Sequence, residues 1–223
     1  MEPVKRVKDL FLTHRDSELA VPMAKYMKDK FPFLGIKKPV REELLKQFYR
    51  ESGILKEPFQ EDFVLALWEQ AEREYQYAAL DYIKRSLKKI AKHDLPLMER
   101  LITTKSWWDT VDMLAQHPVG TIARKYPEVV PETIVGWAAG EQMWLRRAAI
   151  LFQLKYKEKT DEQLLFQIIK WNAKSSEFFI QKAIGWALRE YSKTSPAAVR
   201  QFIVQNELPP LSVREGSKYL GPA

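Results

Sequence analysis

The sequence predicts an all-α protein in which pairs of helices repeat along the chain as an α-solenoid. Apolar residues recur with the helical period of about 3.6 residues in almost every segment, and no segment alternates as a half-buried strand does. Glycine is scarce, at 8 residues, and most of the 13 prolines stand where a helix would end. A repeated pattern of related segments is the third observation.

The helical period and the prolines together place the individual elements in order. We expect Ser106 to be the N-cap of the helix that carries Trp108, with Asp109 as the acid of a capping box. The expected helices cover residues 2–13, 17–30, 40–51, 59–69, 72–90, 95–103, 107–116, 119–125, 128–138, 141–157, 161–171, 176–193, 196–205 and 211–219.

The repeat has a period of about 35 residues. Three segments superimpose so that Ala78, Ala148 and Ala183 share one register, at spacings of 70 and 35 residues, and Met113 fills the missing register. A small residue where neighbouring helices approach, at this period, is typical of HEAT-type α-solenoids. We therefore expect residues 1–223 to form a single HEAT-like repeat domain with a concave binding face.

Composition excludes several classes of protein. The 223 residues include no cysteine, which excludes disulfide scaffolds, thiolate metal sites and cysteine nucleophiles and suits a reducing cytoplasm, where we expect the protein. The three histidines are too scattered for a metal cluster, so neither metal nor cofactor is expected. No apolar run approaches the ~20 residues of a membrane span, and the first residues lack a signal pattern. The net charge of +7 suits a polyanion, although it could equally reflect a solvated surface.

One position before each register residue stands a polar side chain. These residues are Tyr77, Asp112, Arg147 and Lys182, at the same phase of successive units. If the second helix of each unit lines the inner face, the four side chains form one row. Coincidence in a divergent repeat is the alternative.

Residues 105–112 place a large aromatic side chain beside an acid. Residues four apart share a helix face, so Trp107 aligns with Val111 in the core stripe, and Trp108 aligns with Asp112 away from it. An indole and a carboxylate together outside the core indicate a binding site. An ordinary surface acid beside a partly buried Trp is the alternative.

Two further residues break the local pattern. Every helical neighbour of Arg147 is apolar, so its guanidinium needs either a phosphate or a carboxylate partner, the latter in a buried ion pair. Trp186 lies among Lys182, Arg189 and Glu190, outside the core stripe of its helix. An indole among cations is a candidate stacking platform for a sugar or base, although packing between repeats would also account for it.

Four longer motifs carry a resemblance that spans essentially the whole chain. They cover residues 22–27 with 33–36, residues 105–112, residues 144–156 and residues 178–191. With them the chain resembles the bacterial HEAT-repeat alkylpurine DNA glycosylases of the AlkD type. The resemblance implies that Asp112, Trp108 and Trp186 form the catalytic cleft. DNA contacts are expected from Arg147, Lys182, Arg189 and Tyr26. Some relatives lack the acid and are inactive, whereas Asp112 is present here.

The resemblance also implies a mechanism. Its substrates are purines in double-stranded DNA alkylated at N3 or N7, whose positive charge makes the base a good leaving group without a general acid. Asp112 would stabilise the cationic sugar and activate water, with the indoles packed on the sugar. The base would stay in the stack, and a monomeric, monofunctional enzyme would leave an abasic site. The competing hypothesis is a non-catalytic HEAT-repeat scaffold that binds nucleic acid or protein.

Overall fold

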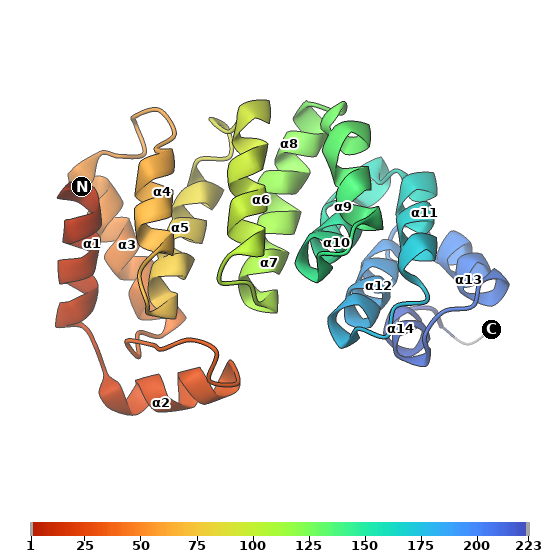
Figure 1. Ribbon diagram of the computed structural model, residues 1–223, viewed down its shortest axis with the longest axis horizontal. Helices are drawn as coiled ribbons and strands as arrows, with labels where there is room; N and C mark the ends of the chain where they lie inside the picture. Colours follow the sequence, from red (N-terminus) through yellow and green to blue (C-terminus); the bar gives the residue numbers. More distant parts are fainter. Residues whose placement is uncertain (1, 222–223) are drawn as a thin grey trace. The chain divides into compact units, whose positions relative to one another are not determined.

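The structure is a computed structural model that describes residues 2–221 (Figure 1). Within these residues every regular element is helical and no strand is present, which confirms the all-α prediction and the HEAT-like solenoid. The helices are α1 (Glu2–Thr13), α2 (Ser17–Tyr26), α3 (Lys38–Ser52), α4 (Glu61–Trp68), α5 (Arg73–Arg85), α6 (Leu95–Thr103), α7 (Trp108–Leu114), α8 (Gly120–Lys125), α9 (Val135–Ala139), α10 (Met143–Leu151), α11 (Glu162–Asn172), α12 (Phe178–Tyr191), α13 (Pro196–Gln205) and α14 (Pro210–Gly216). Short 3-10 helices cover Lys92–Asp94 and Lys157–Lys159, and π-helical turns cover Ala115–Val119 and Val130–Ile134.

The chain divides into two compact units, and the boundary in the sequence falls between Ile90 and Ala91. The first unit holds α1 to α5, in which α4 packs on α5, and α1 packs on α3 and α4. Its core contains stacked rings, with centroids 5.8 Å apart for Phe48 and Phe63. The organisation of residues 1–223 as one domain stays a prediction.

In the first unit, α2 has no buried residue and runs across the ends of the other helices (Figure 1). The loop that follows it is fixed by Glu74, whose carboxylate accepts the backbone N–H groups of Leu34, Gly35 and Ile36 at 2.9–3.1 Å. Gly35 adopts φ +89°, and a Cβ there would come within 1.9 Å of the Asp16 carbonyl oxygen. This loop therefore holds α2 against the unit through these backbone contacts and through Leu34 and Ile36, whose side chains are buried.

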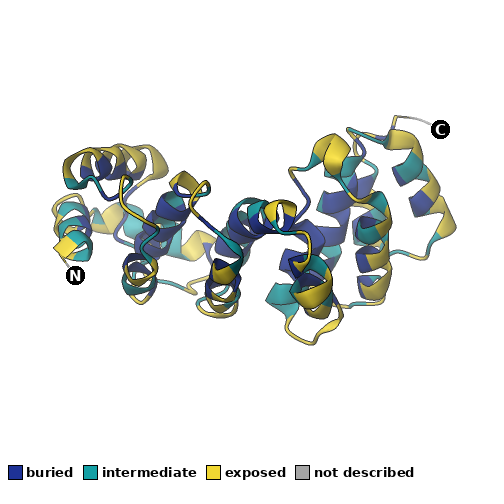
Figure 2. Cartoon of the chain, turned by 90° about the horizontal axis from the view of Figure 1, so that it is seen from above, coloured by how far each residue is buried: buried dark blue, intermediate teal, exposed yellow. Residues whose placement is uncertain are grey.

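The second unit is built around α10. This helix packs on α6, α7, α9, α11 and α12, while α12 packs on α14. Figure 2 shows the buried residues on the helix faces turned toward neighbouring helices. Of the register residues of the repeat, Ala78 in the first unit and Ala148 and Ala183 in the second are fully buried, whereas Met113 is half-buried. Small side chains thus occupy the positions of close packing that the period predicts.

Two local predictions are wrong, and the helices expected over 17–30, 72–90 and 141–157 end earlier, at Tyr26, Arg85 and Leu151. Ser106 does not cap α7: Trp107, in extended conformation, is the N-cap residue, and the Ser106 hydroxyl donates to the Ile102 carbonyl of α6 at 2.6 Å. The unpaired carbonyl at the end of α6 competes successfully for that hydroxyl. The expected break at Pro118 is also absent, because a π-helical turn over Ala115–Val119 joins α7 to α8. The wider turn accommodates the residue that lacks an N–H.

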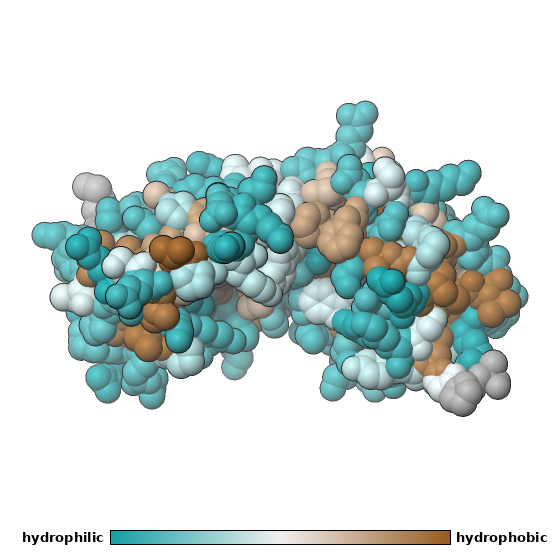
Figure 3. All heavy atoms as spheres, turned by 90° about the horizontal axis from the view of Figure 1, so that it is seen from below, coloured by the Kyte–Doolittle hydropathy of each residue, from teal (hydrophilic) through white to brown (hydrophobic). Residues whose placement is uncertain are grey.

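The molecular surface is mixed. Figure 3 shows hydrophilic residues over much of the face that it presents, with smaller hydrophobic areas. Large side chains that are exposed include Val21, Tyr26, Phe178 and Val204. Among residues 2–221, no helix combines the length and the apolar character needed to cross a membrane.

A close approach of two helices at Gly185 yields the first prediction. A Cβ added there would lie 2.5 Å from the Glu215 Cβ and 3.1 Å from the Ser212 carbonyl oxygen, so α14 would have to move away from α12. We expect Gly185→Ala to lower the free energy of unfolding by about 1–3 kcal/mol, measured by urea denaturation. Gly136→Ala is the matched control, since a Cβ in α9 meets nothing within 4 Å, and it should be neutral or stabilising. Equal behaviour of the two variants would contradict the prediction.

Candidate active site

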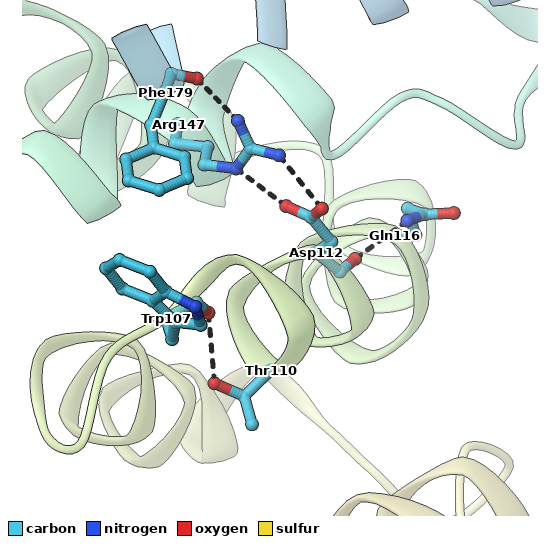
Figure 4. A network of polar contacts seen from close by, with 6 residues as sticks. All are labelled: Trp107, Thr110, Asp112, Gln116, Arg147 and Phe179. Carbon is cyan, nitrogen blue, oxygen red and sulfur yellow. Dashed lines mark hydrogen bonds and ion pairs between the residues drawn. The ribbon is translucent and has the colours of Figure 1, made fainter. Parts of the chain in front are cut away.

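An ion pair joins the middle helices of the second unit (Figure 4). Asp112 of α7 accepts two hydrogen bonds from Arg147 of α10, from Nε to Oδ1 at 2.7 Å and from Nη2 to Oδ2 at 2.9 Å. Nη1 of Arg147 donates to the Phe179 carbonyl oxygen at the start of α12. One guanidinium therefore connects three helices. Of the two partners that the sequence allows for Arg147, the structure provides the carboxylate.

Both members of this pair are buried, since Asp112 is 7% and Arg147 5% exposed. Burial raises the pKa of Asp112 above the usual carboxyl value, because it disfavours the charged form. The hydrogen bonds and positive charge of Arg147 act in the opposite direction, and nearby Asp109 adds to the rise. Asp112 is thus a more basic carboxylate than an exposed one, held in a fixed orientation.

Backbone contacts fix the neighbourhood of the acid on α7. The side chain of Gln116 donates to the Asp112 carbonyl oxygen at 2.9 Å, and the Thr110 hydroxyl donates to the Trp107 carbonyl oxygen at 3.2 Å (Figure 4). These bonds tie side chains to the first turns of the helix. Asp112 consequently projects from a rigid element rather than from a loop.

Three rings form an aromatic cluster beside the ion pair. Trp107, Trp144 and Phe179 lie with ring centroids 5.0–5.8 Å apart. The expected alignment of Trp107 with Val111 in one core stripe holds in part, because Val111 is fully buried and Trp107 only half-buried. The cluster was not predicted, yet its residues are spaced by 37 and 35 positions, which is the repeat period.

The two tryptophans expected in the cleft lie on α7 and α12, two of the three helices that Arg147 joins. Trp108 is one turn before Asp112 on α7, and it is half-buried. Trp186, also half-buried, is seven residues after Phe179 on α12, or about two turns along the same face. Each residue is on a helix that Arg147 contacts. A joint position of both rings around a sugar stays a prediction.

The remaining expected DNA contacts fall into two places. Lys182 and Arg189 of α12 both form ion pairs with Glu215 of α14, at 3.2 and 3.1 Å. Tyr26 ends α2 in the first unit and is 69% exposed. Their contact with DNA stays a prediction.

Of the expected row of polar side chains, one pair of neighbours is in contact, and the alignment of all four residues in one row stays a prediction. Asp112 and Arg147, 35 residues apart, touch directly. Tyr77 in the first unit has the guanidinium of Arg41 at 4.5 Å from its ring centroid. Lys182 meets Glu215, 33 residues further on. Among residues 2–221, no three His, Asp or Glu side chains gather in a way that would hold a metal ion.

Comparison with known proteins places the chain in a family. The family model of the DNA alkylation repair enzymes matches residues 7–220, and the chain belongs to this family. The chain is similar to a predicted DNA alkylation repair enzyme from Enterococcus faecalis, at 37% identity and a TM-score of 0.86, over 94% of this chain and 98% of that one.

A second solved structure shares the fold alone. It is smu.31 from Streptococcus mutans UA159, with 18% identity and a TM-score of 0.59 over 82% of this chain and 98% of that one. No match is found among curated proteins. The family supports a role in the repair of alkylated DNA, which requires DNA as partner.

The ion pair yields a prediction about stability. Arg147→Ala leaves Asp112 buried without its partner, so we expect the free energy of unfolding at pH 7 to fall by about 3 kcal/mol in urea denaturation. Arg124→Ala on α8, where the arginine is exposed, is the control and should change stability little. Should both variants unfold at the same urea concentration, the pair would not hold the three helices together.

Proposed function

We propose that the protein is a monofunctional DNA glycosylase of base excision repair. It hydrolyses the N-glycosidic bond of purines alkylated at N3 or N7 in double-stranded DNA and leaves an abasic site. The observation that carries this proposal is Asp112, a buried carboxylate held by two hydrogen bonds from Arg147 one helical turn after Trp108. A protein that only bound phosphates would gain nothing from a carboxylate that faces its ligand, so an acid beside Trp108 favours catalysis over binding alone.

The chemistry asked of the protein is modest, because the alkylated base already carries a positive charge. As the bond from the sugar C1′ to the base nitrogen breaks, both bonding electrons leave with the base and the sugar becomes cationic. Asp112 stabilises this charge, with no reorganisation because Arg147 fixes it beforehand. Water then bonds to C1′ and loses a proton.

Asp112 is suited to receive that proton. Each of its oxygens accepts one hydrogen bond from Arg147 and has a second lone pair. Its raised pKa makes it a stronger base than an exposed carboxylate. Activation of the water therefore needs no histidine.

The aromatic and basic residues supply binding. The faces of Trp108 and Trp186 pack on the sugar and attract its developing charge, by about 1–2 kcal/mol each where water is excluded. Phosphates are held by Lys182, Arg189 and Tyr26, and by the two N–H groups of Arg147 that contact neither Asp112 nor Phe179. With the lesion gripped through its backbone, the base stays stacked and no flipping is needed.

Asp112→Asn tests the proposal, because it keeps the shape of the side chain and removes its charge. We expect single-turnover excision of 7-methylguanine from duplex DNA to fall on the order of 100-fold or more, with DNA binding retained. Asp109→Asn makes the same change one turn earlier on α7 and should retain excision. A wild-type rate in Asp112→Asn would sink the glycosylase assignment in favour of a non-catalytic nucleic-acid-binding scaffold.

The pH dependence of excision gives a separate test. Asp112 acts as a carboxylate, so excision should fall as the pH decreases through its pKa, which burial raises. The acid limb of the single-turnover rate should thus lie at higher pH than the ordinary carboxyl value of about 4. In Arg147→Ala the limb should move higher still, since the group that lowers this pKa is lost. An acid limb that stays in place in Arg147→Ala would contradict the role of Asp112.

A further inference from the structure

Three cationic side chains meet one carboxylate where α14 packs on α12. Glu215 Oε1 lies 3.2 Å from Lys182 Nζ, and Oε2 lies 3.1 Å from Arg189 Nη1 and 2.8 Å from Lys218 Nζ. The close approach at Gly185 brings Glu215 against α12. The cluster is therefore fixed by the packing of two helix backbones.

The acid is buried, and its partners are partly exposed. The side chain of Glu215 is 9% exposed, against 37% for Lys182, 26% for Arg189 and 47% for Lys218. Hydrogen bonds from Lys218 and then Lys182 lower the pKa of Glu215 to about 2, so the acid is charged at neutral pH. One negative charge faces three positive ones, which leaves an excess of two positive charges on the exposed side.

The cluster surrounds a residue of the candidate active site. Lys182 is four residues before Trp186 on α12 and Arg189 is three residues after it, so all three lie along one face of the helix. A phosphate beside the indole would be adjacent to the sugar on which that indole is proposed to pack. One cation is enough to neutralise the charge of Glu215. The further cations add little stability as exposed ion pairs, so stability alone does not account for three of them.

We propose that Lys182, Arg189 and Lys218 form a binding site for one phosphodiester group of DNA beside Trp186, with Glu215 as the positioning residue that gathers them. This inference rests on the proposed function for its ligand. It adds Lys218 as a phosphate ligand, and it assigns to Glu215 the role of holding the three cations in position. The acid keeps three like charges close together, so their N–H groups point to one place before DNA arrives.

Lys218→Ala tests the site with an unmodified duplex, on which no excision occurs. In a titration of binding against salt, the slope of log K against log salt concentration should become shallower by up to about 0.9, the value for a phosphate contact that is lost entirely. Lys193→Ala is the matched control: Lys193 is 49% exposed and pairs with Glu190 three residues away, as Lys218 pairs with Glu215. Both variants lose one positive charge. An unchanged slope in Lys218→Ala, or an equal change in both, would overturn the site.

Glu215→Gln separates positioning from simple charge. The substitution raises the net charge by one, so attraction at a distance would strengthen binding. We expect the opposite, a several-fold weaker binding, because three cations without their acid repel one another. Binding equal to or tighter than wild type would overturn the positioning role. Circular dichroism shows whether Glu215→Gln is folded. If it is not folded, Lys218→Ala, at an exposed position, remains the test of the phosphate site.

Excision assays keep the two proposals apart. If the wild type releases alkylated purines and Lys218→Ala leaves the salt slope unchanged, the glycosylase proposal stands and the phosphate site is overturned. If the slope depends on Lys218 and no base is released, the site stands and the glycosylase proposal is overturned.

Discussion

The buried pair of Asp112 and Arg147 constrains both the packing of the second unit and the chemistry available to it. Burying two charges is costly unless their hydrogen-bonding groups are satisfied, and here both carboxylate oxygens and a backbone carbonyl share one guanidinium. The arrangement ties α7, α10 and α12 together. The same burial raises the pKa of the acid. The packing of three helices and the raised pKa of the acid thus arise at one place, the buried contact between Asp112 and Arg147.

The position of this pair in the repeat explains how the fold produces it. A polar residue of one helical pair can contact a residue of the next pair about 35 positions away, as Asp112 and Arg147 do. Arg41 with Tyr77 follows this rule in the first unit, and Lys182 with Glu215 follows it in the second. The solenoid repeats a geometry of contact, while the chemistry of each contact differs.

The sequence predicts the helices well, because the helical period and the prolines act locally. The bounds of α1, α6 and α13 agree to the residue. The prediction at Ser106 fails because its hydroxyl donates to a carbonyl of the preceding helix. The prediction at Pro118 fails because a π-helical turn continues the helix past this residue. Arg147 stands out because its helical neighbours are apolar, but its choice of partner depends on a residue 35 positions away. Glu215 has no local signal, and only the packing of α14 on α12 explains its surroundings.

The distribution of the acid, the guanidinium and the anchoring carbonyl over three successive helical pairs has a consequence for the length of the array. Insertion of one complete pair between α7 and α10 would preserve every local packing rule, and each pair would still bury its apolar faces. It would nevertheless place an additional helical pair between Asp112 and Arg147, so the two side chains could no longer touch. The contacts of Arg147 therefore fix the number of helical pairs between α7 and α12.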